Sequence, residues 1–123
     1  MRDIGEIAMV LTRIRNCYRN IQLLTLDCIS ENVPEQIPVL LRNREEIMHL
    51  IAFEEQKILD ESFTEEPLRS LRKEIESVIA SIVIADSQLG TVIKGNLDSI
   101  SNAMGRLYHK SRAVSAYANH SRV

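Results

Sequence analysis

The sequence predicts an all-α protein: an antiparallel helical hairpin followed by a long C-terminal helical segment, together a three- to four-helix bundle. Apolar residues recur at alternating steps of three and four through most of the 123 residues, which is typical of packed helices. Four Gly and three Pro leave little material for β-hairpins. Aromatic residues make up only 4% of the chain, so aliphatic side chains must build the core.

Length and charge bound the organisation of the chain. A chain of this size normally folds as one domain, and we expect one helical domain over residues 1–123 with a weakly ordered tail at residues 110–123. Residues 31–66 hold ten acids and three bases, whereas the last eighteen residues hold four bases and no acid. Four scattered bases are too few to favour nucleic acid as a partner, and they favour a solvated helix end.

The first helix is predicted over about Ile4 to Ile29. Cys17 and Cys28 fall on nearly the same side of it but roughly 16 Å apart along its axis, too far for a disulfide bond. We therefore expect both to be reduced core residues. The apolar stripe of this helix consists of Ile4, Ile7, Leu11, Ile14, Tyr18, Ile21, Thr25 and Cys28.

The second helix is predicted to begin at about residues 35–38, because Pro34 and Pro38 cannot both lie inside one helix and Pro38 fits a first turn. Its stripe is less pure than the first, since Arg44 and two glutamates interrupt the apolar pattern. The stripe consists of Leu40, Leu41, Arg44, Ile47, Met48, Ile51 and Ile58.

The third segment follows "DESFTEEP", in which Ser62 or Thr64 is expected to cap the helix. It is either one helix of roughly 45 residues or two helices that meet near Gly90 and Gly95, each of which costs a helix about 1 kcal/mol. We expect a kink or joint there. Its stripe runs through Leu68, Leu71, Ile75, Val78, Ile82, Ala85 and Leu89, and continues through Ile93, Leu97, Ile100, Met104, Leu107, Ser111 and Val114.

The sequence contains no arrangement of residues that indicates an enzyme. There is no glycine-rich phosphate loop and no metalloprotease or serine-hydrolase motif. The three histidines are scattered, so we expect no metal site and no cofactor. Asp86 interrupts the apolar stripe of the third segment, and we interpret it as a polar residue that fixes the register of helix packing.

The N-terminus lacks the apolar core of an export signal, with five apolar residues in a row flanked by acids. The densest apolar run, "VIASIVIA", has eight residues, against the roughly 20 of a membrane span. The sequence predicts a cytoplasmic protein.

Two resemblances to known families bear on function. "TVIKGNLDSI" is similar to the H-x-L-K-G stretch of histidine-phosphotransfer domains, which are also four-helix bundles. Thr91 stands where the phosphorylated histidine belongs, and threonine lacks the imidazole nitrogen for that chemistry. The alternative that this resemblance supports is a signalling or structural bundle, such as a degenerate phosphotransfer-like domain.

Three other stretches resemble the flagellar export chaperones of the FlgN and FliT type. "VPEQIPVLLRNREEIMHLI" resembles the second helix of that family, and "IVIADSQLGTVIKGNLDSISNAMGRL" resembles its long helix. "AVSAY" is similar to the tyrosine-containing end of FliT-type tails. The likeness covers nearly the whole chain through diffuse amphipathic motifs, and the chain lacks the asparagine of the FlgN long helix.

This second resemblance implies a cytosolic flagellar type III export chaperone. Such a protein binds the C-terminal amphipathic segment of a hook-associated or filament-cap protein and docks on the cytosolic domain of an export-gate membrane protein. The resemblance implies that Tyr117 docks on the gate. A second possibility is that the apolar stripe closes the bundle of its own chain or makes a homodimer. The expected client-binding residues are Leu97, Ile100, Met104, Leu107 and Val114.

Overall fold

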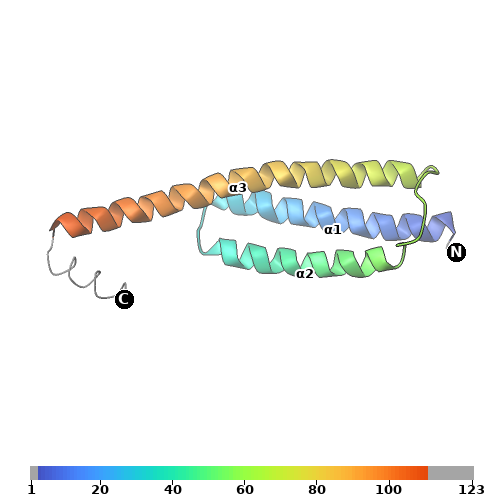
Figure 1. The fold of residues 1–123 in the computed structure, drawn as a ribbon, viewed down its shortest axis with the longest axis horizontal. Coiled ribbons are helices and arrows are strands. Elements are labelled where there is room, and N and C mark those ends of the chain that lie inside the picture. Colours follow the sequence, from blue (N-terminus) through green and yellow to red (C-terminus); the bar gives the residue numbers. More distant parts are fainter. Residues whose placement is uncertain (1–2, 111–123) are drawn as a thin grey trace. The chain divides into compact units, whose positions relative to one another are not determined.

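The computed structural model describes residues 3–110, with side chains described through residue 97. In this part of the chain the structure is all-α and contains no strand (Figure 1). Its helices are α1 (Ile4–Glu31), α2 (Gln36–Gln56) and α3 (Leu68–Lys110). Contacts divide the chain into two compact units, residues 1–89 and residues 90–123. The predicted fold class is therefore confirmed.

Helix α1 has a polar cap at each end. At the start, the Asp3 carboxylate accepts a hydrogen bond of 2.8 Å from the Glu6 amide, as a side chain at this position commonly does. At the end, Asn32 has a left-handed backbone with φ of 52°, and its amide donates to the Cys28 carbonyl. These caps place the helix within two residues of the bounds that the sequence predicts.

Helix α2 begins at Gln36, inside the predicted window, and Pro38 lies in its first turn. A proline is tolerated there because its missing N–H would have no partner within the helix. The amides of Gln36 and Ile37 instead donate to the carbonyls of Val33 and Pro34 in the connection. The two prolines thus separate α1 from α2 as the sequence predicts.

Helix α3 is one continuous helix of 43 residues. It runs through Gly90 and Gly95, so the structure shows the single-helix alternative rather than two helices that meet there. Its start differs from the prediction, because Leu68 begins the helix and lies too far along the chain for Ser62 or Thr64 to cap it. The two hydroxyl groups contact each other at 3.3 Å instead.

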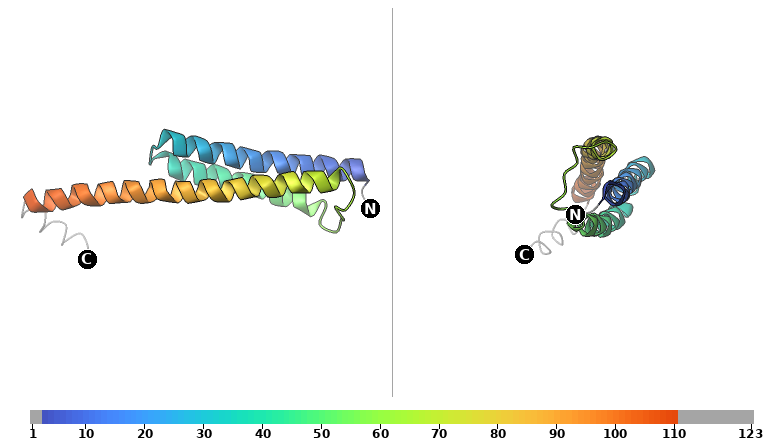
Figure 2. Two further views of the ribbon diagram at one scale, coloured as in Figure 1. Left: turned by 90° about the horizontal axis from the view of Figure 1, so that it is seen from above. Right: turned by 90° about the vertical axis from the view of Figure 1, so that its right-hand side faces the viewer.

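The first unit is a three-helix bundle in which α1 packs against both α2 and α3. Helix α2 runs antiparallel to α1 and α3, and α1 lies behind the other two in the view of Figure 1; Figure 2 shows the same arrangement from the end. The core is almost wholly aliphatic. Its buried residues include Ile7, Val10, Leu11, Ile14, Ile21, Ile47, Ile51, Ile58, Leu68, Ile75 and Ile82.

The core confirms most of the predicted stripes and corrects the second. Thr25 is fully buried, and its hydroxyl donates to the Ile21 carbonyl, which satisfies the polar group inside the bundle. Leu41 and Met48 are exposed, although the sequence predicts them in the stripe. The reason is geometric: Leu40 and Ile47 already fill the side of α2 that faces α1 and α3, and Leu41 and Met48 lie about a quarter turn away.

Candidate functional site

Arg44 of α2 and Asp86 of α3 join the two helices by a two-pronged ion pair. One guanidinium nitrogen donates to Oδ1 at 2.6 Å and the other to Oδ2 at 3.0 Å. Their side chains are 22% and 41% exposed, so the pair lies at the surface of the α2–α3 contact and not in the core. A planar guanidinium bound in this way fixes both distance and orientation. The expectation that Asp86 sets the register of packing is consistent with this geometry.

Exposed apolar side chains flank this ion pair on both helices. Leu41 and Met48 lie three residues before and four after Arg44, and Ile79 and Val83 lie seven and three residues before Asp86. These spacings place each residue on the same side of its helix as the charged group. The exposed fractions are 52% for Leu41, 45% for Met48, 37% for Ile79 and 64% for Val83.

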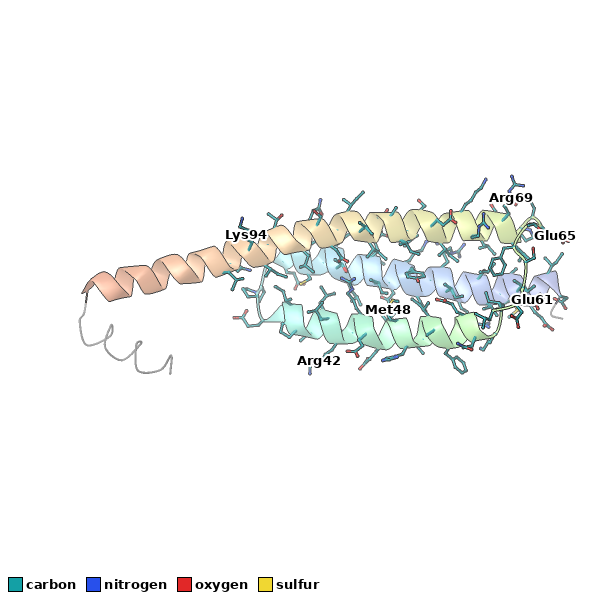
Figure 3. All side chains as sticks on the ribbon, viewed as in Figure 1. Arg42, Met48, Glu61, Glu65, Arg69 and Lys94 are labelled. Atoms are coloured by element: carbon teal, nitrogen blue, oxygen red, sulfur yellow. The ribbon has the colours of Figure 1, made fainter. Side chains whose placement is uncertain are left out.

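We name this set of residues the α2–α3 strip; it consists of Leu41, Met48, Ile79, Val83 and the Arg44–Asp86 pair. Figure 3 shows Met48 on the side of α2 that is turned toward α3. The sequence predicts Met48 in the apolar stripe of the second helix, and it gives no signal that distinguishes Val83. Only the packing of three helices distinguishes the buried from the exposed half of these stripes.

A separate pocket of about 300 Å³ lies at the contact of the three helices. Its apolar lining includes Leu11 and Ile14 of α1, Leu59 and Phe63, which follow α2, and Ile75 of α3. Tyr18, Glu55 and Arg72 bring polar groups to this mostly apolar lining. A concave apolar surface with a few polar groups is the usual form of a site that takes an apolar side chain.

The predicted client-binding residues fall mostly outside the described side chains. Leu97 is described, and its side chain is 61% exposed. Ile100, Met104 and Leu107 lie on the continuous helix α3, which places them on one side of it by their spacing, although their side chains are not described. Val114 and the predicted gate-docking residue Tyr117 lie outside the described residues.

The two cysteine thiols of α1 both have raised pKa values. Burial, reinforced by the nearby charge of Glu54, raises the pKa of the Cys17 thiol above its ordinary value. Burial likewise raises the pKa of Cys28, with a smaller contribution from Glu31. A thiol with a raised pKa holds little thiolate at neutral pH and is a poor nucleophile. Both cysteines are free, as the sequence predicts.

Two carboxylates have the opposite shift, and both stabilise contacts between helices. Arg13 of α1 holds the pKa of Glu54 below its usual range by a hydrogen bond, and Lys57 adds to this. Arg15 of α1 does the same for the pKa of Glu74 on α3, at 2.7 Å. These pairs connect α1 to each of its neighbours.

Within the described residues, no group of three or more His, Cys, Asp and Glu side chains is placed to hold a metal ion. Thr91, the residue at the phosphotransfer position, is exposed on α3. The described side chains thus offer exposed apolar residues beside the Arg44–Asp86 pair, one mostly apolar pocket and ion pairs between helices.

One helix of the described residues is long and apolar enough to cross a bilayer, namely α3 between Leu68 and Leu97. Length and composition alone carry this result, and the core helix of a bundle passes the same test. In this chain one side of that helix carries the buried residues Ile75, Ile82 and Leu89. Other apolar residues of the same helix, Ile79, Val83 and Ile84, are exposed.

Comparison with known proteins adds no relative. The chain matches no protein-family model, and neither the curated proteins nor the solved structures give a match.

Proposed function

We propose that this protein is a binding module that covers the amphipathic helix of a partner protein, and that it serves as a cytosolic flagellar type III export chaperone. The proposed client is the C-terminal amphipathic segment of a hook-associated or filament-cap protein, which is then delivered to the export gate. The flagellar setting comes from the resemblance of the three quoted stretches to chaperones of the FlgN and FliT type.

The observation that carries the proposal is the continuation of α3 as a helix through Leu97, Ile100, Met104 and Leu107. The first of these side chains is 61% exposed, so the bundle core that ends at Leu89 does not absorb it. An apolar stripe on one side of a helix is a binding element for a second amphipathic helix. Each large apolar side chain that such a contact buries contributes about 1.5–3 kcal/mol.

The test is binding of the double variant Ile100→Asp/Leu107→Asp to the isolated C-terminal segment of a hook-associated or cap protein. Two carboxylates placed in the contact would lose hydration without gaining partners, so we expect binding to be lost. Isothermal calorimetry measures the affinity, and circular dichroism checks that helix content is unchanged.

The matched control is Asn102→Asp/His109→Asp. It adds two carboxylates at the same spacing of seven residues, but at helix positions on the other side from the stripe. We expect the control to bind as the unchanged protein does. Equal loss in both variants would indicate a general charge effect, and unfolding of the stripe variant alone would assign the stripe to the core of the protein itself.

A further inference from the structure

The pocket at the contact of the three helices is apolar over most of its lining. Its volume of about 300 Å³ is about twice the roughly 150 Å³ that holds a benzene molecule in an apolar cavity. The pocket is thus large enough for one aromatic side chain together with the atoms that carry it. The apolar residues of the lining are Leu11, Ile14, Ile58, Leu59, Phe63 and Ile75.

Two opposite charges line the same pocket without pairing with each other. Glu55 belongs to α2 and Arg72 to α3. The Arg72 guanidinium contacts Glu76, one turn further along α3, at 3.6 Å, and half of the Arg72 side chain is exposed. Among the side chains of residues 3–97, the Glu55 carboxylate has no ion-pair or hydrogen-bond partner. An occupant of the pocket can therefore reach both a carboxylate and a guanidinium.

Tyr18 of α1 adds a hydroxyl group to the lining. Burial, with a smaller contribution from the nearby charge of Glu55, raises the pKa of the Tyr18 phenol above its ordinary value. The hydroxyl is therefore protonated at neutral pH and can donate a hydrogen bond. The pocket thus combines an apolar interior with one anion, one cation and one neutral donor.

We propose that this pocket binds a free α-amino acid with a large apolar side chain. The side chain lies among the apolar residues, the ammonium group faces Glu55 and the carboxylate faces Arg72. A neutral apolar molecule would leave both charges unused, and an ion of either sign would lie close to a charge of its own sign. A zwitterion satisfies both charges.

This site goes beyond the proposed function and does not depend on it. All of its lining residues belong to the first unit, residues 1–89, and its test needs no partner protein.

The experiment is an NMR titration of the full chain with four ligands that share an indole ring: tryptophan, tryptamine, indole-3-propionate and indole. We expect tryptophan to bind about tenfold more tightly than indole, with the two singly charged ligands between them. The factor reflects two exposed ion pairs, each of which strengthens binding about three- to fivefold.

Methyl signals locate the bound ligand. Those of Ile14, Ile58 and Ile75, which line the pocket, should shift, while those of Ile21 and Ile47, which are core residues outside the lining, should not. The chain contains no tryptophan, so the signals of indole ring protons come from the ligand alone. Nuclear Overhauser effects between these protons and the shifted methyl groups then show that the ring is inside the pocket.

Two charge variants test the two ends of the ligand separately. Glu55→Gln should weaken the binding of tryptophan and of tryptamine about three- to fivefold without weakening that of indole-3-propionate. Arg72→Gln should weaken tryptophan and indole-3-propionate by the same factor without weakening tryptamine. Both side chains are exposed, so both variants should fold, and circular dichroism checks this.

The matched controls are Glu46→Gln and Lys73→Gln. Glu46 is an exposed acid nine residues before Glu55, which places it on the opposite side of α2. Lys73 is the exposed base next to Arg72 and lies about 100° around α3. Neither residue lines the pocket, and we expect both controls to bind all four ligands as the unchanged protein does.

Three results would overturn the proposal. One is the absence of binding by tryptophan. Another is equal affinity for tryptophan and indole, which would indicate a pocket for any apolar group, such as a side chain of a partner protein. The third is a charge variant that weakens tryptophan no more than its control does. Client binding enters none of these results, so this proposal and the proposed function can fail independently.

Discussion

Two residues that interrupt the apolar pattern, Arg44 and Asp86, turn out to belong together. The sequence shows each as an irregularity in its own stripe, 42 residues apart, and nothing in the spacing pairs them. In the structure they form the two-pronged ion pair that joins α2 to α3. Two polar groups that would each be costly beside an apolar contact are satisfied by each other.

We predict that Asp86→Asn lowers the free energy of unfolding by about 1–2 kcal/mol, because it leaves the half-buried Arg44 guanidinium without its counter-charge. The control is Glu76→Gln, which removes one charge from the exposed Arg72–Glu76 pair of the same helix. An exposed pair of this kind contributes at most about 0.5 kcal/mol. Urea denaturation of both variants measures the difference. Equal effects would show that the Arg44–Asp86 pair contributes no more to the free energy of unfolding than the exposed pair does.

Glu54 and Glu74 give the stability of the protein a dependence on acid pH. In the folded protein the pKa of each is lowered by an arginine of α1, so folding favours the charged form. The stabilisation is present above the ordinary pKa of about 4.5 and is lost as the pH falls through the lowered value. We predict that the free energy of unfolding decreases below about pH 4.5.

The measurement is urea denaturation between pH 7 and pH 3. Glu54→Gln should be less stable than the unchanged protein at pH 7 and should lose less stability on acidification, because the titrating carboxylate is gone. Parallel curves for the two proteins would show that Glu54 does not contribute to the acid dependence.

At the scale of the element, the sequence suggested a joint near the glycines of α3, but the helix continues through them. Gly90 and Gly95 lie inside a continuous helix, and a Cβ atom placed on either would meet nothing within 4 Å. Neither glycine is thus required by close packing in the described structure. Their remaining effect is entropic, since glycine loses more backbone freedom than alanine when a helix forms.

We therefore predict that Gly90→Ala and Gly95→Ala each stabilise α3 by about 0.5–1 kcal/mol. Hydrogen exchange of the amides around residues 90–95 should slow accordingly, while exchange in α1 stays unchanged as an internal control. Faster exchange in either variant would mean that a side chain at that position disturbs a contact.

Helix α2 carries apolar residues of two kinds, some buried in the core and some exposed. Leu40, Ile47 and Ile51 are buried against the other helices, while Leu41 and Met48, a quarter turn away, stay exposed beside the Arg44–Asp86 pair. The stripe is wide because it holds both core residues and exposed apolar residues. The width of the stripe is visible in the sequence, but the sequence does not show which of its residues are buried and which are exposed.

At the scale of the whole molecule, Tyr117 is the residue that we expect to dock the proposed chaperone on the export gate. The residue lies outside the described part of the chain, and its role rests on the resemblance to FliT-type tails. We predict that Tyr117→Ala weakens binding to the cytosolic domain of the gate protein by about 2 kcal/mol or more, as loss of an aromatic interface anchor does. Calorimetry against both partners is the measurement, and client affinity should stay within about 0.5 kcal/mol.

Two outcomes would revise this role. Unchanged gate binding by Tyr117→Ala would remove the residue from gate recognition. Loss of client binding with normal gate binding would place Tyr117 in the client contact instead.

The sequence by itself determined the fold class, the bounds of α1 within two residues, the start of α2 and the main core positions. It could do so because these features depend on local chemistry: apolar spacing of three and four residues, capping side chains and the positions of proline. The free cysteines also followed, since helix rise alone places Cys17 and Cys28 too far apart for a disulfide bond.

Tertiary structure alone decided which apolar residues are core and which are surface. Leu41 and Ile47 look equivalent in a stripe, and only the positions of α1 and α3 around α2 bury one and expose the other. The pairing of Arg44 with Asp86 could likewise not be predicted, because it joins segments that are 42 residues apart in the sequence. Helix periodicity fixes the direction in which a side chain points, but burial depends on what the rest of the chain places in front of it.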